Sequence, residues 1–237
     1  MATEELAPAG PSVRYGPLVH RSVRHGAILW IVAVLQFVAA MIVTQIGYGS
    51  SYSLTQNYIS DLGANSCGVF SGRYICSPWY YVFDASAVIL GILIIVGVIL
   101  IRTAFPPRGT RTVGLGLLAI SQLGAIGVGL SPETYNLTIH SLSAALAFVG
   151  ANLALIVLGI AMFRDTRWDG YRAYTMLSGL VGLIAFGLFE AKAYGPLGVG
   201  GMERLIVAPV LLWALLVGIH LVRIPTYAPP GVRGART

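Results

Sequence analysis

The sequence predicts an all-α membrane protein, a six-transmembrane helix bundle with both chain ends in the cytoplasm. Three observations carry this prediction: 56% of the residues are apolar and only 10% are charged, the apolar residues fall into six long runs, and the basic residues are unevenly distributed. So little charge cannot cover a water-soluble surface. The mean hydropathy of +0.78 therefore reflects membrane spans rather than one buried core.

Each of the six runs holds about 20 residues, enough to cross roughly 30 Å of hydrocarbon as a helix. In chain order, the predicted spans are Ala27 to Gly47, Tyr80 to Ile101, Val113 to Leu130, Ser141 to Phe163, Ala173 to Ala193 and Leu205 to Val222. The first run follows Arg21 and Arg24, as a signal peptide would. It is longer than a signal-peptide core and lacks an A-x-A cleavage pattern, so we interpret it as a retained span.

The basic residues fix the predicted orientation. With both ends inside, the cytoplasmic segments hold 12 of the 15 basic residues, namely Arg14, Arg21, Arg24, Arg102, Arg108, Arg111, Arg164, Arg167, Arg172, Arg223, Arg233 and Arg236. This excess is typical of cytoplasmic loops, and it predicts a plasma-membrane protein whose arginines face anionic lipid headgroups. Membrane lipids are thus the expected partners. No nucleic-acid-binding pattern accompanies the net charge of +6, so nucleic acid is not.

The segments outside the spans differ in character. Residues 1–24 and 224–237 are rich in Ala, Pro, Gly and Arg without an apolar period, which predicts mobile cytoplasmic tails around a transmembrane domain of residues 25–223. The loop of residues 48–79 is long enough to pack over the outer mouth of the bundle.

That outer loop carries two further features. Cys67 and Cys76 are the only cysteines, and we expect them to form a disulfide there, with two free thiols as the alternative. Around Asp61 the pattern also suggests a short amphipathic turn, with Tyr58, Ile59 and Leu62 toward the bilayer and Asn57, Ser60 and Asp61 toward water.

Polar and small residues inside the spans predict how the helices meet. Gln36, Gln122 and Asn152 fall near mid-bilayer, where an unpaired amide is costly, so we expect Gln122 and Asn152 to approach each other. A polar permeation track is the alternative. Small residues spaced by four on spans three and four should let these helices pack closely; they are Ser121, Ala125, Gly129, Ser143, Ala147 and Ala151.

Ionisable residues gather at the outer ends of the spans and predict a polar ring at one mouth of the bundle. The candidate ligand-binding residues are Asp61, Asp84, Glu133, His140, Glu190, Glu203 and Arg204, with Lys192 nearby. Two structural explanations compete with a binding site: Asp84 in the first turn of span two can stabilise the helix N-terminus, and Glu190 can pair with Arg204. With a single histidine among these residues we expect no metal and no cofactor, and we assign no catalytic residue.

Four motifs resemble the bacterial and archaeal membrane family catalogued as domain of unknown function 998. They are Gln56-Asn-Tyr-Ile-Ser-Asp-Leu-Gly63, Phe83-Asp84-Ala-Ser86, His140-Ser-Leu-Ser-Ala144, and Gly201-Met-Glu-Arg204 with Trp213. The first and third motifs are also distantly similar to DRAM-type membrane proteins. The resemblance implies a six-helix membrane fold and gives weight to Asp61, His140, Glu203 and Arg204, without supplying an activity.

Three functions fit these residues. The preferred hypothesis is a non-enzymatic or regulatory protein whose outward-facing polar site binds a small polar ligand or a lipid headgroup, with Arg204 as the anion partner and His140 as a pH-sensitive donor. The second is a membrane-embedded hydrolase or transferase, with or without a metal ion, that uses His140 together with Asp61 or Glu190. The third is a small secondary transporter that uses the mid-bilayer amides as a track.

Overall fold

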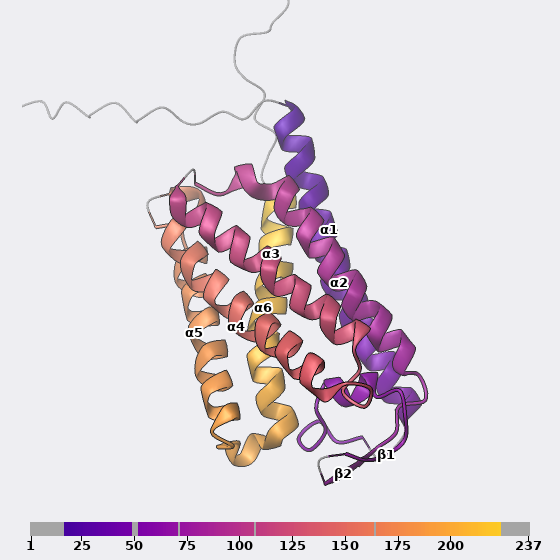
Figure 1. Cartoon of the computed structure of the whole chain (residues 1–237). Helices are drawn as coiled ribbons and strands as arrows, with labels where there is room; N and C mark the ends of the chain where they lie inside the picture. Colours follow the sequence, from indigo (N-terminus) through magenta and orange to yellow (C-terminus); the bar gives the residue numbers. More distant parts are fainter. Residues whose placement is uncertain (1–16, 49–51, 71, 107, 164, 224–237) are drawn as a thin grey trace, which may run out of the picture.

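Six long helices run back and forth along one axis (Figure 1) in this computed structural model, which describes residues 17–48, 52–70, 72–106, 108–163 and 165–223. They are α1 (Pro17–Tyr48), α2 (Tyr80–Ile101), α3 (Gly109–Leu130), α4 (Leu137–Ala161), α5 (Tyr171–Glu190) and α6 (Gly198–Arg223). All six are long and apolar enough to cross a membrane, which confirms the predicted fold class. Helix α1 begins ten residues before the predicted span, within the stretch expected as a tail. The other tail residues, 1–16 and 224–237, lie outside the described chain.

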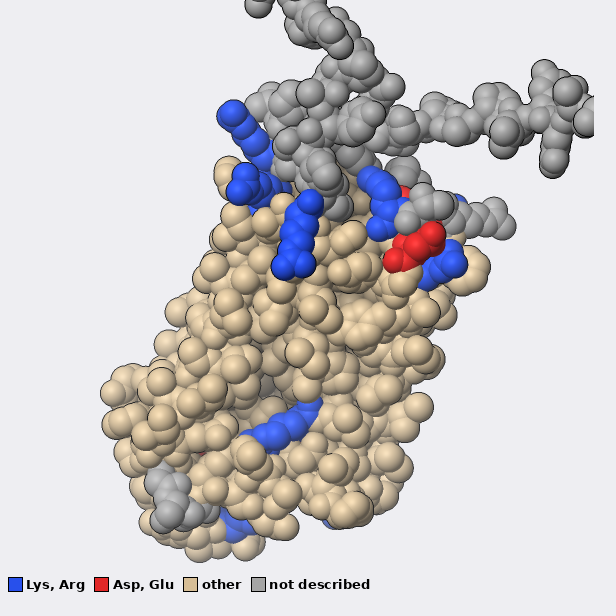
Figure 2. Space-filling view, turned by 180° about the vertical axis from the view of Figure 1, so that it is seen from behind, with Lys and Arg blue, Asp and Glu red and all other residues tan. Residues whose placement is uncertain are grey.

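The bundle has two different ends. One end, called the loop end below, carries residues 52–79, 131–136 and 191–197. It includes the short helices η1 (Ser60–Gly63) and η4 (Gly195–Leu197). It also carries a hairpin of β1 (Gly68–Phe70) and β2 (Arg73–Ile75) (Figure 1). The opposite end holds η2 (Arg102–Ala104) and η3 (Thr166–Trp168). Most Lys and Arg side chains visible in Figure 2 gather at the opposite end, above a wide uncharged belt.

Small residues bring α3 and α4 together, partly at predicted positions: Ser121, Ser143 and Ala147 lie at this contact, whereas the predicted Gly129 packs against Asp84 and Ala87 of α2. A Cβ on Gly124 would collide with the carbonyl oxygen of Ser143 and the backbone of Ala147, and a Cβ on Gly150 would collide with Ser121. Each helix packs against the next in the chain, and α1 also packs against α6, so the six helices close into a ring.

Two buried tryptophans link neighbouring helices at the centre of the bundle. Trp30 on α1 and Trp213 on α6 are fully buried, with ring centroids 5.4 Å apart. The Trp30 Nε1–H donates to the carbonyl oxygen of Ile94 at 3.1 Å, and the Trp213 Nε1–H donates to Thr175 Oγ1 at 2.9 Å. Four helices, α1, α2, α5 and α6, are thereby linked through satisfied polar groups.

Helices α4 and α5 lie close together near the opposite end and diverge toward the loop end (Figure 1). Gly159 faces Met176, and Gly182 faces the side chain of Asn152, with no room for a Cβ at either glycine. Nearer the loop end, large aromatic side chains separate the two helices, and the rings of Phe148 and Phe186 lie 6.4 Å apart. This divergence makes space for the pocket described below.

Candidate functional site at the loop end

Residues 52–64, here called the cap segment, fold over the loop end of the bundle. Asp61 and Leu62 are completely buried, and Asn57, Ile59 and Ser60 are nearly so. The expected amphipathic turn, with one face in lipid and the other in water, is therefore wrong. Residues 57–64 are covered on both faces, with Tyr58 half-buried, because this part of the segment packs down between the helix ends; the hydrogen bonds described next satisfy its polar groups.

Asp61 is the centre of the polar contacts in the cap segment. Its carboxylate accepts hydrogen bonds from Asn57 Nδ2 at 2.8 Å, from the Tyr58 backbone N–H at 3.1 Å and from Arg73 Nη2 at 3.0 Å. The Arg73 guanidinium also lies over the Tyr58 ring, 4.0 Å from its centroid. A buried carboxylate is thus held by one positive charge and two neutral donors.

The predicted disulfide between Cys67 and Cys76 is confirmed. It encloses the β1–β2 hairpin, in which Phe70 pairs with Arg73 across the turn. The crosslink therefore restrains the strand that brings Arg73 to Asp61.

Glu133, in the connection between α3 and α4, lies against the same cluster. Ser60 Oγ donates to its Oε2 at 3.4 Å, while its Oε1 is buried without a hydrogen-bond partner. Burial, followed by the nearby Asp61 carboxylate, raises the pKa of Glu133 to about 8.

Two more candidates, His140 and Glu203, join this cluster from α4 and α6. The backbone N–H of Ile59 donates to Glu203 Oε2, which ties α6 to the cap segment. His140 Nδ1 lies 2.9 Å from the carbonyl oxygen of Ser131, so that contact fixes the ring. Both side chains are buried.

The remaining ionisable candidates lie apart from this cluster. Arg204 Nη1 donates to the carbonyl oxygens of Leu54, Asn57 and Gly200 at 2.8 to 3.0 Å, and its Nη2 donates to the Tyr52 hydroxyl. These contacts fasten the cap segment to α6, and Glu190 has an exposed side chain on α5.

Asp84 also has a different place from the one expected. The α2 helix starts with Trp79 as its N-cap, without a side-chain capping bond, and Asp84 falls beyond its first turn. The Asp84 side chain is buried against Gly63, and its Oδ1 makes no hydrogen bond.

A pocket of about 570 Å³ opens beside this cluster, between the cap segment, the hairpin, α4 and α5. One part of its wall is polar, formed by Tyr58, Ser60, Arg73, Glu133, His140, Glu190 and Glu203. The other part is apolar and belongs mainly to the diverging helices, with Leu137, Ala144, Ala145, Phe148, Phe186 and Phe189. A pocket with these two kinds of wall suits a molecule that has a polar and an apolar part.

The three mid-bilayer amides, Gln36, Gln122 and Asn152, form hydrogen bonds within the bundle, and two of them also line a second cavity. Gln36 Nε2 donates across to the Ser86 carbonyl oxygen on α2. Asn152 Nδ2 donates to the Ile206 carbonyl oxygen on α6, and Gln122 Nε2 donates to its neighbour Ser121. The expected approach of Gln122 to Asn152 is thus replaced by other partners, although both residues line a cavity of about 110 Å³ at the bundle centre.

Within the residues that the structure describes, no three His, Cys, Asp or Glu side chains are grouped so that they could hold a metal ion. The loop-end cluster is carboxyl-rich with one histidine, Arg73 neutralises Asp61, and Glu203 is used by a backbone N–H.

The sequence reasoning missed Arg73 and Tyr58 as members of the site. Arg73 stands between the two cysteines in the loop that also holds Asp61, so a disulfide hairpin folded back on that loop would bring the two charges together. This combination of a crosslink and a lone opposite charge was the available signal.

The model of a family described as "Protein of unknown function (DUF998)" matches residues 31–220. No curated protein and no solved structure matches the chain.

Proposed function

Because the chain belongs to the DUF998 family, whose description carries no activity, we propose a function from the geometry of the loop end. The protein is a non-enzymatic, regulatory membrane protein that binds the polar head of an amphiphile, such as a membrane lipid, in the loop-end pocket. The observation that carries this proposal is the pocket itself, in which a polar wall under the cap segment meets an apolar wall on α4 and α5.

The divergence of α4 and α5 supports access from the bilayer. The two helices touch closely around Gly159 and Gly182, and they separate where Phe148 and Phe186 line the pocket. A lipid can therefore enter sideways between the helices, with its head reaching the polar wall and its chains remaining against apolar side chains.

The charges of the pocket favour a head that carries an amine. Three glutamates, Glu133, Glu190 and Glu203, line it together with one arginine, and Arg73 is already paired with Asp61. The pKa of Glu133 is raised to about 8, so this buried side chain is protonated near neutral pH while the pocket is empty; a cationic amine beside it would stabilise the carboxylate form and take the place of that proton. A zwitterionic or amine-bearing head is thus a better match than an anionic one.

The proposed setting is the plasma membrane, with both chain ends in the cytoplasm and the loop end outside. Eight of the eleven Lys and Arg in the described residues lie at the opposite end, which supports this orientation. A disulfide at the loop end also fits an oxidising compartment.

The test compares lipids by the thermal stability of the purified protein. We expect phosphatidylethanolamine to stabilise the protein more than phosphatidylglycerol, because only the first of these heads carries an amine. A ligand at about 100 times its Kd adds about 2.7 kcal/mol to the free energy of unfolding. Glu133→Gln should remove this preference, and Asp169→Asn at the opposite end should keep it. Equal stabilisation by both lipids would overturn the proposal, whereas turnover of the lipid that stops in His140→Gln would identify a hydrolase instead.

A further inference from the structure

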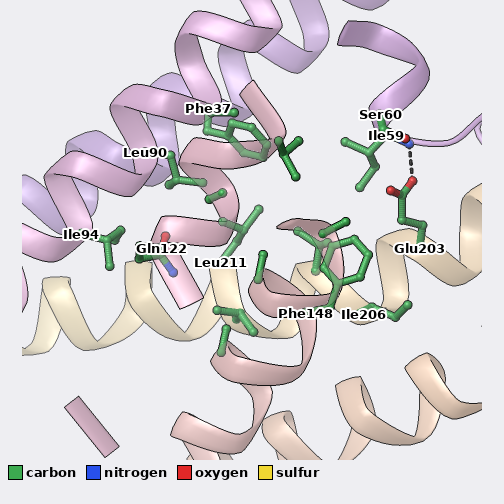
Figure 3. Close-up of a pocket in the computed structure, with 18 of the residues that line it drawn as sticks. Phe37, Ile59, Ser60, Leu90, Ile94, Gln122, Phe148, Glu203, Ile206 and Leu211 are labelled. Atoms are coloured by element: carbon green, nitrogen blue, oxygen red, sulfur yellow. Dashed lines mark hydrogen bonds between the residues drawn. The ribbon is translucent and has the colours of Figure 1, made fainter. Parts of the chain in front are cut away.

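The centre of the bundle contains an apolar cavity that the proposed head-binding site does not use. It measures about 110 Å³ and is lined by side chains from α1, α2, α3, α4 and α6, with Ile59 and Ser60 of the cap segment at one end. Figure 3 shows Ser60 and Glu203 at that end and Ile94 and Gln122 at the other. Apart from these ends the labelled walls are hydrocarbon, including Phe37, Leu90, Ile206 and Leu211.

The amides at the deep end leave the cavity apolar in character. Asn152 Nδ2 is occupied by the carbonyl oxygens of Phe148 and Ile206, and its Oδ1 lies against Gly182 of α5. Gln122 Nε2 is occupied by Ser121. Apolar cavities of about 150 Å³ in proteins stay dry and take up benzene or xenon, so a space of this size and lining suits a short hydrocarbon segment better than water.

The cavity adjoins the loop-end pocket. Five residues line both spaces: Ser60, His140, Ala144, Phe148 and Glu203. The apolar side chains of Ala144 and Phe148 are thus part of the boundary that a chain would pass to reach the cavity from a head on the polar wall.

We propose that the central cavity binds the end of a hydrocarbon chain of the amphiphile whose head occupies the loop-end pocket. This inference rests on the proposed function and adds its selectivity: the protein recognises the length of a chain as well as the chemistry of a head. The cavity ends near Ala214 on α6 and Ile94 on α2, and a chain that reaches this depth has filled the available space.

The test is a chain-length series of monoalkyl phosphoethanolamines, used below their critical micelle concentrations, with phosphoethanolamine as the chainless member. Affinity should rise about fourfold for each CH₂ group that enters the cavity and then level off when the cavity is full. Ala214→Leu fills the deep end and should level off at a shorter chain, with unchanged affinity for phosphoethanolamine. Ala208→Leu makes the same change at an exposed position of α6 and should match the wild type.

A second measurement uses the wild type alone. An alkyl phosphoethanolamine with a diazirine at the chain end should label residues at the deep end of the cavity, such as Ile94 and Gln122, when peptides are mapped by mass spectrometry. Identical chain-length curves for Ala214→Leu and Ala208→Leu, or labelling confined to lipid-facing residues, would overturn the chain site and leave head binding intact. Failure of the wild type to bind any member, phosphoethanolamine included, would overturn both proposals.

Discussion

At the scale of single residues, the loop end is organised around buried charge that finds its partners close by. Asp61 is completely buried, and its three donors, from Asn57, Tyr58 and Arg73, all come from within 12 residues along the chain. Removing one partner from such a cluster leaves the others desolvated without compensation, which costs more than the pair itself contributes.

We therefore expect Asp61→Ala to lower the free energy of unfolding by about 3 kcal/mol, because Arg73 and two neutral donors lose their acceptor. Unfolding in a titration with sodium dodecyl sulfate measures this change. The matched control is Asp169→Ala, since Asp169 pairs with Arg172 while 58% of its side chain is exposed, and such pairs contribute less than about 1 kcal/mol. Equal losses for the two variants would contradict the role given to Asp61.

Glu133 should make the stability of the protein depend on pH. Burial and the Asp61 carboxylate raise its folded pKa from 4.5 to about 8, so between these values the folded state keeps a proton that the unfolded state has lost. Rising pH then favours the unfolded state, and the melting temperature should fall from about pH 5 to about pH 8. Glu133→Gln should remove this part of the slope, measured as the difference between the two melting curves over that range. Parallel pH profiles for wild type and variant would argue against the buried, carboxyl-facing position.

Sequence reasoning reached part of this cluster and not the rest. It placed Asp61, His140 and Glu203 at one end of the bundle, because depth follows from counting along a helix. It could not place them around the helix axes, so the contacts of Arg204 with backbone carbonyls and of Arg73 with Asp61 were both out of reach. Rotation about each axis is set by packing between helices, which a single hydropathy profile does not contain.

At the scale of helices, close approach depends on a few glycines. Gly124 on α3 lies directly against the backbone of α4 at Ser143 and Ala147, and Gly116 on the same helix faces open space. In lipid, helices associate largely through such close packing, because apolar side chains gain little by leaving an apolar solvent.

Gly124→Val should force α3 and α4 apart and lower the free energy of unfolding by about 2 kcal/mol, a usual cost of overpacking. Gly116→Val introduces the same side chain on the same helix without a neighbour to displace. The two variants can be compared by thermal unfolding in one detergent. A loss in Gly116→Val as large as that in Gly124→Val would mean that helix propensity, and not packing, decides the outcome.

The helices themselves were largely predictable, and their ends were not. All six spans were identified from hydropathy, and α2 has the predicted limits Tyr80 and Ile101. Helix α1 begins ten residues early and α4 begins at Leu137, because a helix continues beyond hydrocarbon where polar residues such as His20 and Arg21, or a capping residue such as Asn136, permit it. Hydropathy locates the segment that lies in the hydrocarbon core, whereas hydrogen bonding decides where the helix begins and ends.

At the scale of the whole molecule, the asymmetry of charge predicts orientation. Arginine-rich segments are attracted to anionic headgroups and resist translocation, so this asymmetry predicts that both chain ends lie in the cytoplasm. Fusions of a reporter that is active only in the cytoplasm should be active at the C-terminus and inactive when inserted at Gly72, in the hairpin turn at the loop end. Activity in the reverse pattern would reverse the assignment of the loop end to the outside.

The contacts of the cap segment also set an order for biosynthesis. Asp61 finds its partners within the loop between the first two helices, so this charge is satisfied early in translation. Two backbone groups of the cap have partners that are synthesised much later. The Ile59 N–H donates to Glu203, 144 residues further along the chain, and the Leu54 carbonyl oxygen accepts from Arg204, 150 residues further along. Closure of the cap therefore requires the last helix, and a chain that stops short of it leaves these two backbone groups without their partners.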